Sequence, residues 1–382
     1  MTVAIVNATC TSCGKTVEVD NQKDAWVCPH CSTPFIVSKA INKYKTQHKN
    51  VAKKVKAVKK NSSDFEVSDG VLIAYKGSAE EVAVPAEVHK IGENAFENNT
   101  TLRKMILHDK VEVIGGYAFR GCSALEDIKF PDDLQDIEGW AFRGCTSLKS
   151  IVIPPHMQRI ADCVFADCTS LVSVEFPEPI GEIGAFAFSG CKNLEVIEIP
   201  KYVSIIGKYA FSGCEKLEKI AIPEGVSIIE ECTFANCTAL SAVGLSRGLK
   251  SICASAFQNC VSLRNIEIPA GVLSVDGFRG CTGLRAFTVP PGATSIGDFS
   301  GCTNLEQISL PASVKKISGG FTDCPKLLNI SWSNLAENAV NFPAYYETVV
   351  ASRKTAGKCV YCGGDFKLLS KVCKVCGKKK DY

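Results

Sequence analysis

"GYAFRGCSALEDIKFPDD" occupies Gly116–Asp133, and "GWAFRGCTSLKSIVIPPH" occupies Gly139–His156, beginning 23 residues later. Both stretches hold a phenylalanine, a cysteine three residues after it and a leucine three residues after the cysteine. Self-similarity at a fixed period of about 20–29 residues is typical of solenoids, in which each copy forms one coil. The pair of stretches therefore predicts a repeat architecture.

The repeat continues through most of the chain. The phenylalanines recur in steps of 23 residues as far as Phe257 and then in steps of 21 or 22, and a leucine always follows six residues later. One unit cannot bury its apolar residues alone, so we expect neighbouring coils to stack equivalent residues into ladders. The eleven phenylalanines are Phe96, Phe119, Phe142, Phe165, Phe188, Phe211, Phe234, Phe257, Phe278, Phe299 and Phe321.

Most units contain a version of L-x-x-I-x-I-P, as in "LEVIEIP" at 194–200 and "LRNIEIP" at 263–269. The alternation predicts a short strand with one buried face, and the proline ends it because proline cannot donate to a ladder. A second apolar pair, as in "VSIIGKYAF" at 203–211, predicts a second short strand or turn. We expect the residues four after each leucine to line an open face: Ile106, Lys129, Val152, Glu175, Glu198, Ala221, Gly244, Glu267, Thr288, Ser309 and Ser331.

The full pattern, [I/V]-G-x-x-A-F-x-G-C-x-x-L-x-x-I-x-I-P, resembles the BspA-like leucine-rich repeats of bacteria and some protists over about residues 65–335. Residues 65–96 resemble the N-terminal capping hairpin and first coil of that family. The resemblance implies a β-rich right-handed solenoid of leucine-rich repeats with about eleven coils, which binds other molecules, usually proteins. Many BspA-like proteins are exported and surface-anchored, whereas this sequence shows no such signals.

Ten cysteines, each three residues after a repeat phenylalanine, share one position of the repeat. We interpret them as structural, because a small thiol fits a tight buried turn and can donate to a backbone carbonyl. A row of metal sites along these cysteines is the alternative, but no histidine or carboxylate accompanies them. The ten are Cys122, Cys145, Cys168, Cys191, Cys214, Cys237, Cys260, Cys281, Cys302 and Cys324.

A second column of side chains, rich in aromatic residues, stands two residues before each phenylalanine. If the rings remain partly exposed, they form an interaction patch. The interpretation that we favour is that they cover the backs of neighbouring coils. The column comprises Asn94, Tyr117, Trp140, Cys163, Phe186, Tyr209, Cys232 and Ser255.

Each end of the chain carries two C-x2-C pairs. Cys10, Cys13, Cys28 and Cys31 lie near the start, and Cys359, Cys362, Cys373 and Cys376 lie near the end. Two such pairs on facing hairpins supply the four thiolates of a tetrahedral zinc site, which has no open position for water and is therefore structural. We predict one Zn²⁺ ion in each of two small zinc ribbons. Redox C-x-x-C pairs are the alternative, but the βαβ context that they need is missing.

Charge is distributed unevenly along the chain. Residues 1–60 carry a net charge of +8, residues 351–382 carry +7, and residues 61–350 carry −12. Lys39–Lys60 holds nine lysines and no acidic residue, in the pattern of a basic amphipathic helix. We interpret this segment as a connector, with a short coiled-coil seam or a contact with nucleic acid or anionic lipid as alternatives. We therefore expect any phosphate binding at the two basic ends, including the C-terminal ribbon, and not on the acidic solenoid.

Five parts follow from these patterns. We expect an N-terminal zinc ribbon at 1–38, a basic helix or linker at 39–62, the solenoid with its capping hairpin at 63–332, a C-terminal cap or linker at 333–356 and a second ribbon at 357–382. The histidines share no repeat phase and have no fixed serine or aspartate partner, so we predict no enzyme activity. They are His30, His48, His89, His108 and His156.

The leading functional hypothesis is a cytoplasmic scaffold whose solenoid binds a protein partner, with structural zinc at both ends. The alternative is a nucleic-acid-associated protein that contacts phosphates through its basic ends. No run of about 18 apolar residues predicts a transmembrane segment. The 21 cysteines, without an export signal, favour thiols over disulfides and hence the cytoplasm.

Overall fold

A computed structural model of the chain describes residues 5–9, 15–20, 25–27, 29, 34–36, 62–327, 329–332, 350–351, 353–360, 365–367, 371–374 and 379–380. The chain divides into two compact units, Met1–Asn61 and Ser62–Tyr382. The first unit contains two antiparallel hairpins. They consist of β1 (Ile5–Thr9) with β2 (Thr16–Asp20), and of β3 (Ala25–Val27) with β4 (Pro34–Ile36).

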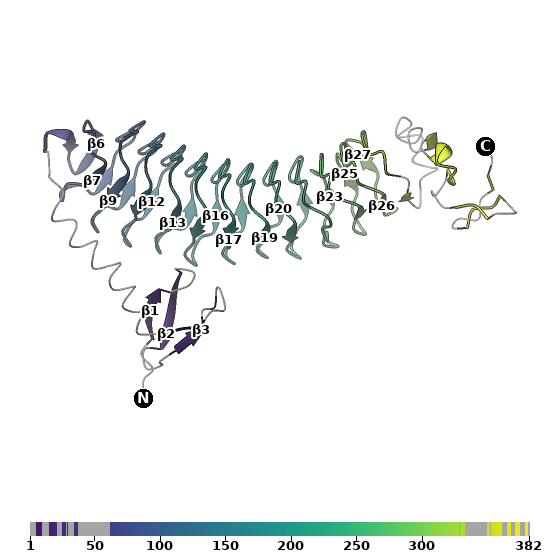
Figure 1. Ribbon diagram of the computed structural model, residues 1–382, viewed down its shortest axis with the longest axis horizontal. Coiled ribbons are helices and arrows are strands. Elements are labelled where there is room, and N and C mark those ends of the chain that lie inside the picture. The colour runs from purple at the N-terminus through teal and green to yellow at the C-terminus, as the bar shows by residue number, and fades with distance from the viewer. Residues whose placement is uncertain are drawn as a thin grey trace. The chain divides into compact units, whose positions relative to one another are not determined.

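The second unit contains the solenoid, whose coils contribute short parallel strands to two series (Figure 1). The predicted strand in "LRNIEIP" at 263–269 is an exception, because no strand forms over these residues. One series follows the repeat leucines, apart from its first strand, which precedes Leu102, and we call its outer surface the leucine-side face. It comprises β7 (Glu81–Ala83), β9 (Lys104–Ile106), β11 (Asp127–Lys129), β13 (Ser150–Val152), β15 (Ser173–Glu175), β17 (Val196–Ile197), β19 (Lys219–Ala221), β21 (Ala242–Gly244), β24 (Ala286–Thr288), β26 (Gln307–Leu310) and β28 (Asn329–Trp332).

The other series precedes the repeat phenylalanines, and we call its outer surface the phenylalanine-side face. It comprises β8 (Lys90–Ile91), β10 (Val113–Ile114), β12 (Asp136–Ile137), β14 (Arg159–Ile160), β16 (Glu182–Ile183), β18 (Ile205–Ile206), β20 (Ile228–Ile229), β22 (Ser251–Ile252), β23 (Ser274–Val275), β25 (Ser295–Ile296) and β27 (Lys316–Ile317).

The prediction of a half-buried strand is confirmed on the leucine side in β11, β13 and β19, where the middle residue is buried and both neighbours are exposed.

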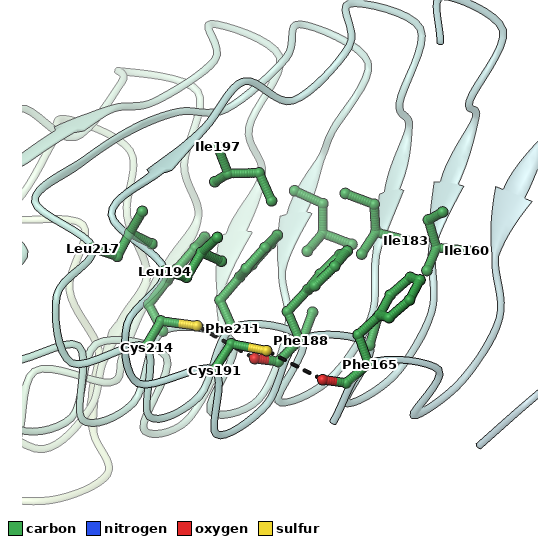
Figure 2. Close-up of a cluster of buried hydrophobic side chains, with 14 of the residues drawn as sticks. Ile160, Phe165, Ile183, Phe188, Cys191, Leu194, Ile197, Phe211, Cys214 and Leu217 are labelled. Atoms are coloured by element: carbon green, nitrogen blue, oxygen red, sulfur yellow. Dashed lines mark hydrogen bonds between the residues drawn. The ribbon is translucent and has the colours of Figure 1, made fainter. Parts of the chain in front are cut away.

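The repeat phenylalanines form a continuous ladder through the core. Successive rings stack with centroids 5.0–5.7 Å apart and planes within 18° of parallel. This spacing is close to the strand separation of about 4.8 Å, so one ring per coil fills the core without gaps. Figure 2 shows Phe165, Phe188 and Phe211 in this stack, with Leu194 and Leu217 beside them. The predicted stacking is therefore confirmed.

The turn after each phenylalanine explains the F-x-G-C pattern. The residue two positions after the ring has a φ of 57–77° in every coil, a region that glycine, asparagine and aspartate enter at least cost. Asn98, Gly121 and Asp167 are examples. In every coil but the first, which has Asn99, the next residue is the repeat cysteine. Its Sγ lies 3.0–3.3 Å from the carbonyl oxygen of the preceding coil's phenylalanine, as Figure 2 shows for Cys191 and Phe165.

An antiparallel hairpin covers the first coil. It follows a short 3-10 turn, η1 (Ser62–Asp64), and consists of β5 (Phe65–Ser68) and β6 (Val71–Tyr75). Asp69 and Gly70 both have positive φ, which is the geometry of a tight two-residue hairpin turn. β6 pairs in parallel with β8, and the Tyr75 ring lies 5.1 Å from that of Phe96. The hairpin therefore extends one sheet and covers the exposed end of the phenylalanine ladder.

Candidate functional site

The leucine-side face presents both apolar and charged side chains to solvent. Val152 on β13 is 62% exposed, and Val196 on β17 is 53% exposed. β13, β15 and β17 pair in register, so that Ser150, Ser173 and Val196 form one row across the face. The predicted outward positions are exposed or partly exposed from Lys129 to Ser309.

Ile106 is the exception among these outward positions, because it is only 9% exposed. The side chain of Ser331 lies outside the described residues. The remaining positions combine small or apolar side chains with the exposed charged residues Lys129, Glu175, Glu198 and Glu267.

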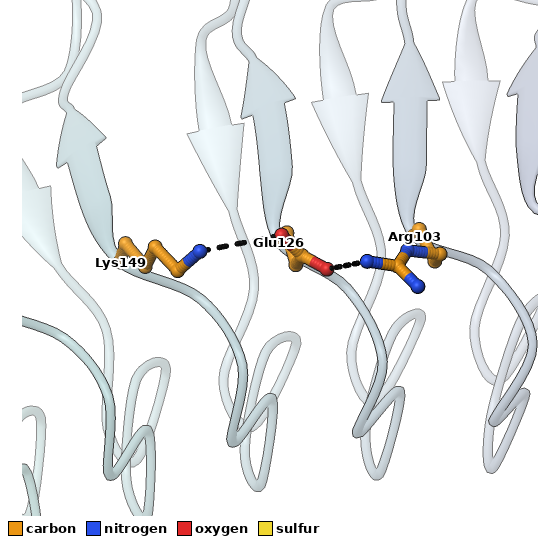
Figure 3. A network of polar contacts seen from close by, with 3 residues as sticks. All are labelled: Arg103, Glu126 and Lys149. Atoms are coloured by element: carbon orange, nitrogen blue, oxygen red, sulfur yellow. Dashed lines mark hydrogen bonds and ion pairs between the residues drawn. The ribbon is translucent and has the colours of Figure 1, made fainter.

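Charged residues directly after the repeat leucines form a rim along this face. Glu126 contacts Arg103 on one side, and its Oε2 lies 3.3 Å from Lys149 Nζ on the other (Figure 3). The hydrogen bond from Lys149 and the nearby charge of Arg103 hold the pKa of Glu126 below its usual value. Such exposed pairs contribute little stability, so the rim mainly sets the charge pattern that a partner meets.

The column two residues before the phenylalanines adopts a left-handed backbone. Its φ values are 54–66° from Asn94 to Ser255. Tyr117 and Trp140 stack at 5.8 Å, whereas Phe186 and Tyr209 stack at 4.5 Å with an interplanar angle of 4°. The favoured interpretation is confirmed for these four rings, because they stack on neighbouring coils. Phe186 stays 39% exposed, and an interaction patch here stays a prediction.

The repeat cysteines do not form a reactive site. Every one of them donates its thiol to a phenylalanine carbonyl, and nine of the ten are buried. Burial raises the pKa of Cys168, Cys237 and Cys281 to about 12. The thiolate is the form that attacks electrophiles and binds metals, so these thiols are inert near neutral pH. The structural interpretation of the ladder is confirmed.

A polar groove that the sequence patterns did not predict lies over β8, β10, β12 and β14. Its volume is about 1190 Å³, and its lining includes His89, Glu112, Gln135, Asp136 and His156. His89, Glu112 and Gln135 each stand directly before a strand of the phenylalanine-side series. These three residues share one repeat position, seven residues before Phe96, Phe119 and Phe142, whereas His156 lies nine residues before Phe165.

The predicted metal ligands are only partly described. Cys10, Cys13, Cys28, Cys31, Cys362 and Cys376 lie outside the described residues. The two that are described are both buried, with exposed fractions of 0% for Cys359 and 1% for Cys373. Among the described residues, no three histidine, cysteine, aspartate or glutamate side chains gather as a metal site requires. The zinc prediction therefore stays a prediction.

Asp365 connects the surroundings of the two described C-terminal cysteines. Its carboxylate lies 2.6 Å from Nζ of Lys358, the residue before Cys359. Its carbonyl accepts the N–H of Lys374, the residue after Cys373, at 2.8 Å. Cys373 also forms an antiparallel bridge with Phe366. Asp365 thus contacts both the residue before Cys359 and the residue after Cys373.

Comparison with known proteins agrees with the architecture. The model of the BspA type leucine-rich repeat region, which comprises six copies, matches residues 73–180, 160–277 and 275–348. No curated protein matches the chain. Within the described part of the chain, no helix combines the length and apolar character that crossing a membrane requires.

Several solved structures are similar to the chain. A leucine-rich cell surface protein from Faecalibacterium prausnitzii is 28% identical, with a TM-score of 0.48 over 70% of this chain and 92% of that one. The leucine-rich repeat protein of T. pallidum is 27% identical, with a TM-score of 0.41 over 55% and 92%. A leucine-rich repeat protein from Bacteroides ovatus is 22% identical, with a TM-score of 0.38 over 85% and 92%.

Proposed function

The chain belongs to the BspA type leucine-rich repeat family, and from this premise we propose that its solenoid is a non-catalytic scaffold that binds a protein partner on the leucine-side face. The observation that carries the proposal is the exposure of Val152 on β13 and Val196 on β17, which belong to one sheet with β15 between them. Exposed apolar groups with charged residues around them are typical of protein-binding patches.

The test is affinity capture of the partner by the full-length protein and by two matched double variants. Val152→Asp with Val196→Asp places two charges on the leucine-side face, and we expect it to lose the partner. Ile205→Asp with Ile228→Asp is the control, because it places the same charges at exposed isoleucines on the phenylalanine-side face. Both variants should keep the circular dichroism of the parent. Retention of the partner by the first variant, or its loss from both, would contradict the choice of face.

A nuclease-treated arm separates this function from nucleic-acid binding through the basic ends. A partner that binds the solenoid is captured equally in both arms. Material that disappears with nuclease would instead favour phosphate contacts by the terminal lysines. Those contacts would weaken log-linearly with salt concentration.

We also propose that each end holds one structural Zn²⁺ ion. At the C-terminal end, the burial of Cys359 and Cys373 and the link through Asp365 fit a closed four-cysteine site that includes Cys362 and Cys376. At the N-terminal end, Cys10 and Cys13 fall between β1 and β2, and Cys28 and Cys31 fall between β3 and β4. Native mass spectrometry should find two zinc ions per chain, and Cys10→Ser with Cys13→Ser should remove one.

The cysteine chemistry favours a reducing compartment, and we place the protein in the cytoplasm. Ladder thiols that donate to carbonyls, and thiols that bind zinc, must all stay reduced. Cell fractionation, combined with alkylation of thiols at lysis, tests this assignment. Recovery of the chain outside the cytoplasm would contradict it.

A further inference from the structure

The phenylalanine-side face carries exposed apolar side chains near its middle. Tyr202 is 61% exposed, Ile205 is 53% exposed and Ile228 is 41% exposed, and we call these three residues the apolar patch. Ile205 and Ile228 are the first residues of β18 and β20 on successive coils, whose stacked phenylalanine rings lie 5.6 Å apart. The same position is polar on the coils to either side, with Glu182 on β16 and Ser251 on β22. An exposed apolar patch with polar residues around it marks an interaction site.

A row of alternating charges borders the apolar patch. The row occupies the position four residues before the first strand residue of each coil. The polar groove is lined by Asp109 from this position and by Asp136 from the position of the two isoleucines, so the two positions border one face. A molecule that covers the apolar patch therefore meets the charge row as well. The members of the row in four successive coils, all of them exposed, are Glu178, Lys201, Glu224 and Arg247.

The order of these charges is complementary to itself when it is reversed. From Glu178 to Arg247 the signs run minus, plus, minus, plus, so a second copy that runs in the opposite direction presents plus, minus, plus, minus. Two identical surfaces meet around a twofold axis, so that each contact occurs twice. A second copy of this chain is therefore a partner with matching charge.

The twofold axis that produces this match runs parallel to the strands, midway between β18 and β20. Such an axis reverses the order of the coils and keeps the strand direction, so each repeat position faces the same repeat position of the other copy. Ile205 then faces Ile228 of the partner subunit. Tyr202 faces Gly225 of the partner subunit, which has no side chain to obstruct the ring. The centre of the contact is thus apolar, as is usual for the core of an interface.

Charge favours this place for the axis over the neighbouring ones. Here Lys201 faces Glu224 of the partner subunit, and Glu178 faces Arg247 of the partner subunit. Moving the axis onto the coil of β18 would place Lys201 against its own copy, and moving it onto the coil of β20 would do the same for Glu224. Like charges directly opposite each other are strongly unfavourable across an interface.

We infer that the chain pairs with a second copy of itself through the apolar patch, with the two solenoids antiparallel around a twofold axis between β18 and β20. The leucine-side face of each subunit remains uncovered in this dimer. Self-association and the proposed binding of a protein partner therefore use different surfaces, and either can fail without the other.

The first test measures the dimer dissociation constant of the full-length chain by sedimentation equilibrium. Ile205→Asp with Ile228→Asp places carboxylates of both subunits against each other at the centre of the contact, so the constant should rise by more than about 100-fold. Val152→Asp with Val196→Asp is the control on the leucine-side face and should dimerise like the parent. If the parent sediments as a monomer at every concentration, or if the two variants behave alike, the inference is overturned.

Charge reversal tests the position of the axis. Lys201→Glu and Glu224→Lys each place like charges opposite each other, so each variant alone should dimerise about 100-fold more weakly than the parent. A mixture of the two variants should regain an affinity close to that of the parent, because every contact between these positions in the mixed dimer joins opposite charges. Both positions are exposed, so both variants should keep the circular dichroism of the parent. A mixture that stays monomeric while the parent dimerises would overturn the antiparallel arrangement.

Discussion

Cysteines of the solenoid and cysteines of the C-terminal module, by which we mean the part of the chain from residue 350 onward, are equally buried, but their surroundings differ. Cys168 donates its thiol to the carbonyl of Phe142 at 3.2 Å and has a copy of itself on each neighbouring coil. Cys359 follows a helix whose Arg353 reaches the next residue, and no repeat duplicates it. Burial alone therefore does not distinguish the ladder cysteines from the cysteines that we propose as zinc ligands.

The comparison also separates two ways of stabilising structure. The stability of the solenoid is approximately the sum of many similar contacts between neighbouring coils, so the loss of one contact removes only a small part of the total. The described part of the C-terminal module has few buried side chains, of which Arg353, Cys359 and Cys373 are three. We therefore expect single changes to have large effects in the module and graded effects in the solenoid.

The largest effect should come from Cys359→Ser with Cys373→Ser. Structural zinc contributes about 10–16 kcal/mol to the folding of small metal domains, so if the C-terminal ion is bound as proposed, the module should unfold and that ion should be lost. Cys145→Ser with Cys168→Ser is the matched control in the solenoid, where the hydroxyl can still donate and the change should cost only about 1–3 kcal/mol. Native mass spectrometry counts the metal, and the amide spectrum by NMR shows which part unfolds. Equal effects of the two pairs would remove the distinction between the two kinds of cysteine.

Next in size is Phe188→Ala in the middle of the ladder. Phe188 is fully buried and stacks on Phe165 and Phe211, so its truncation leaves a cavity and should cost about 3–5 kcal/mol. Val152→Ala is the control on the exposed face and should stay within about 0.5 kcal/mol. Urea unfolding measures both. A small effect of Phe188→Ala would mean that neighbouring coils move to fill the cavity, and that the core is less rigidly packed than the regular ring spacing indicates.

The ladder thiols should make the solenoid sensitive to alkali. Burial raises the pKa of Cys168, Cys237 and Cys281 from 9.0 to about 12, so their folded forms keep protons that the unfolded chain has already lost. The stabilisation is complete below pH 9 and is lost as the pH rises toward 12, by at most about 1.4 kcal/mol per cysteine and pH unit. Urea unfolding at a pH of about 8 and about 10 measures this slope.

The matched variant for this slope carries alanine at all three positions. It should be less stable than the parent at the lower pH, and its stability should fall less steeply between the two pH values. Lysines and tyrosines titrate in the same range, but they are common to both proteins and cancel in the difference. Parallel slopes would contradict the assignment of the effect to the ladder thiols.

Much of the solenoid could be predicted from its sequence because periodicity reports packing directly. The period placed Phe188 in a ladder, and the cysteine three residues later in a turn whose carbonyl partner belongs to the neighbouring coil. The polar groove escaped because His89 and His156 hold different positions relative to the strands that follow them, so they share no repeat phase. Arg353 escaped because it lies outside the repeat, where a single arginine near the end of a basic chain carries no signal of burial.

The smallest effect should come from Phe186→Asn in the left-handed column. Phe186 has a φ of 57°, which costs a side chain with a Cβ about 1–2 kcal/mol, and asparagine tolerates this conformation better. The change also loses the stack on Tyr209, worth about 0.5–1.5 kcal/mol. These terms oppose each other, so the free energy of unfolding should change by less than about 1 kcal/mol.

Phe186→Ala sharpens the same measurement, because it loses the stack and keeps the backbone strain. Urea unfolding should therefore rank the alanine variant below the asparagine variant. The opposite order would show that the left-handed backbone is relaxed here, because the N–H of Phe186 donates to the Lys208 carbonyl of the next coil at 2.9 Å. The expected order would mean that Phe186 is kept at this position despite a strained backbone, and that its ring stays partly exposed. In the ladder, by contrast, burial and shape determine which residue is found.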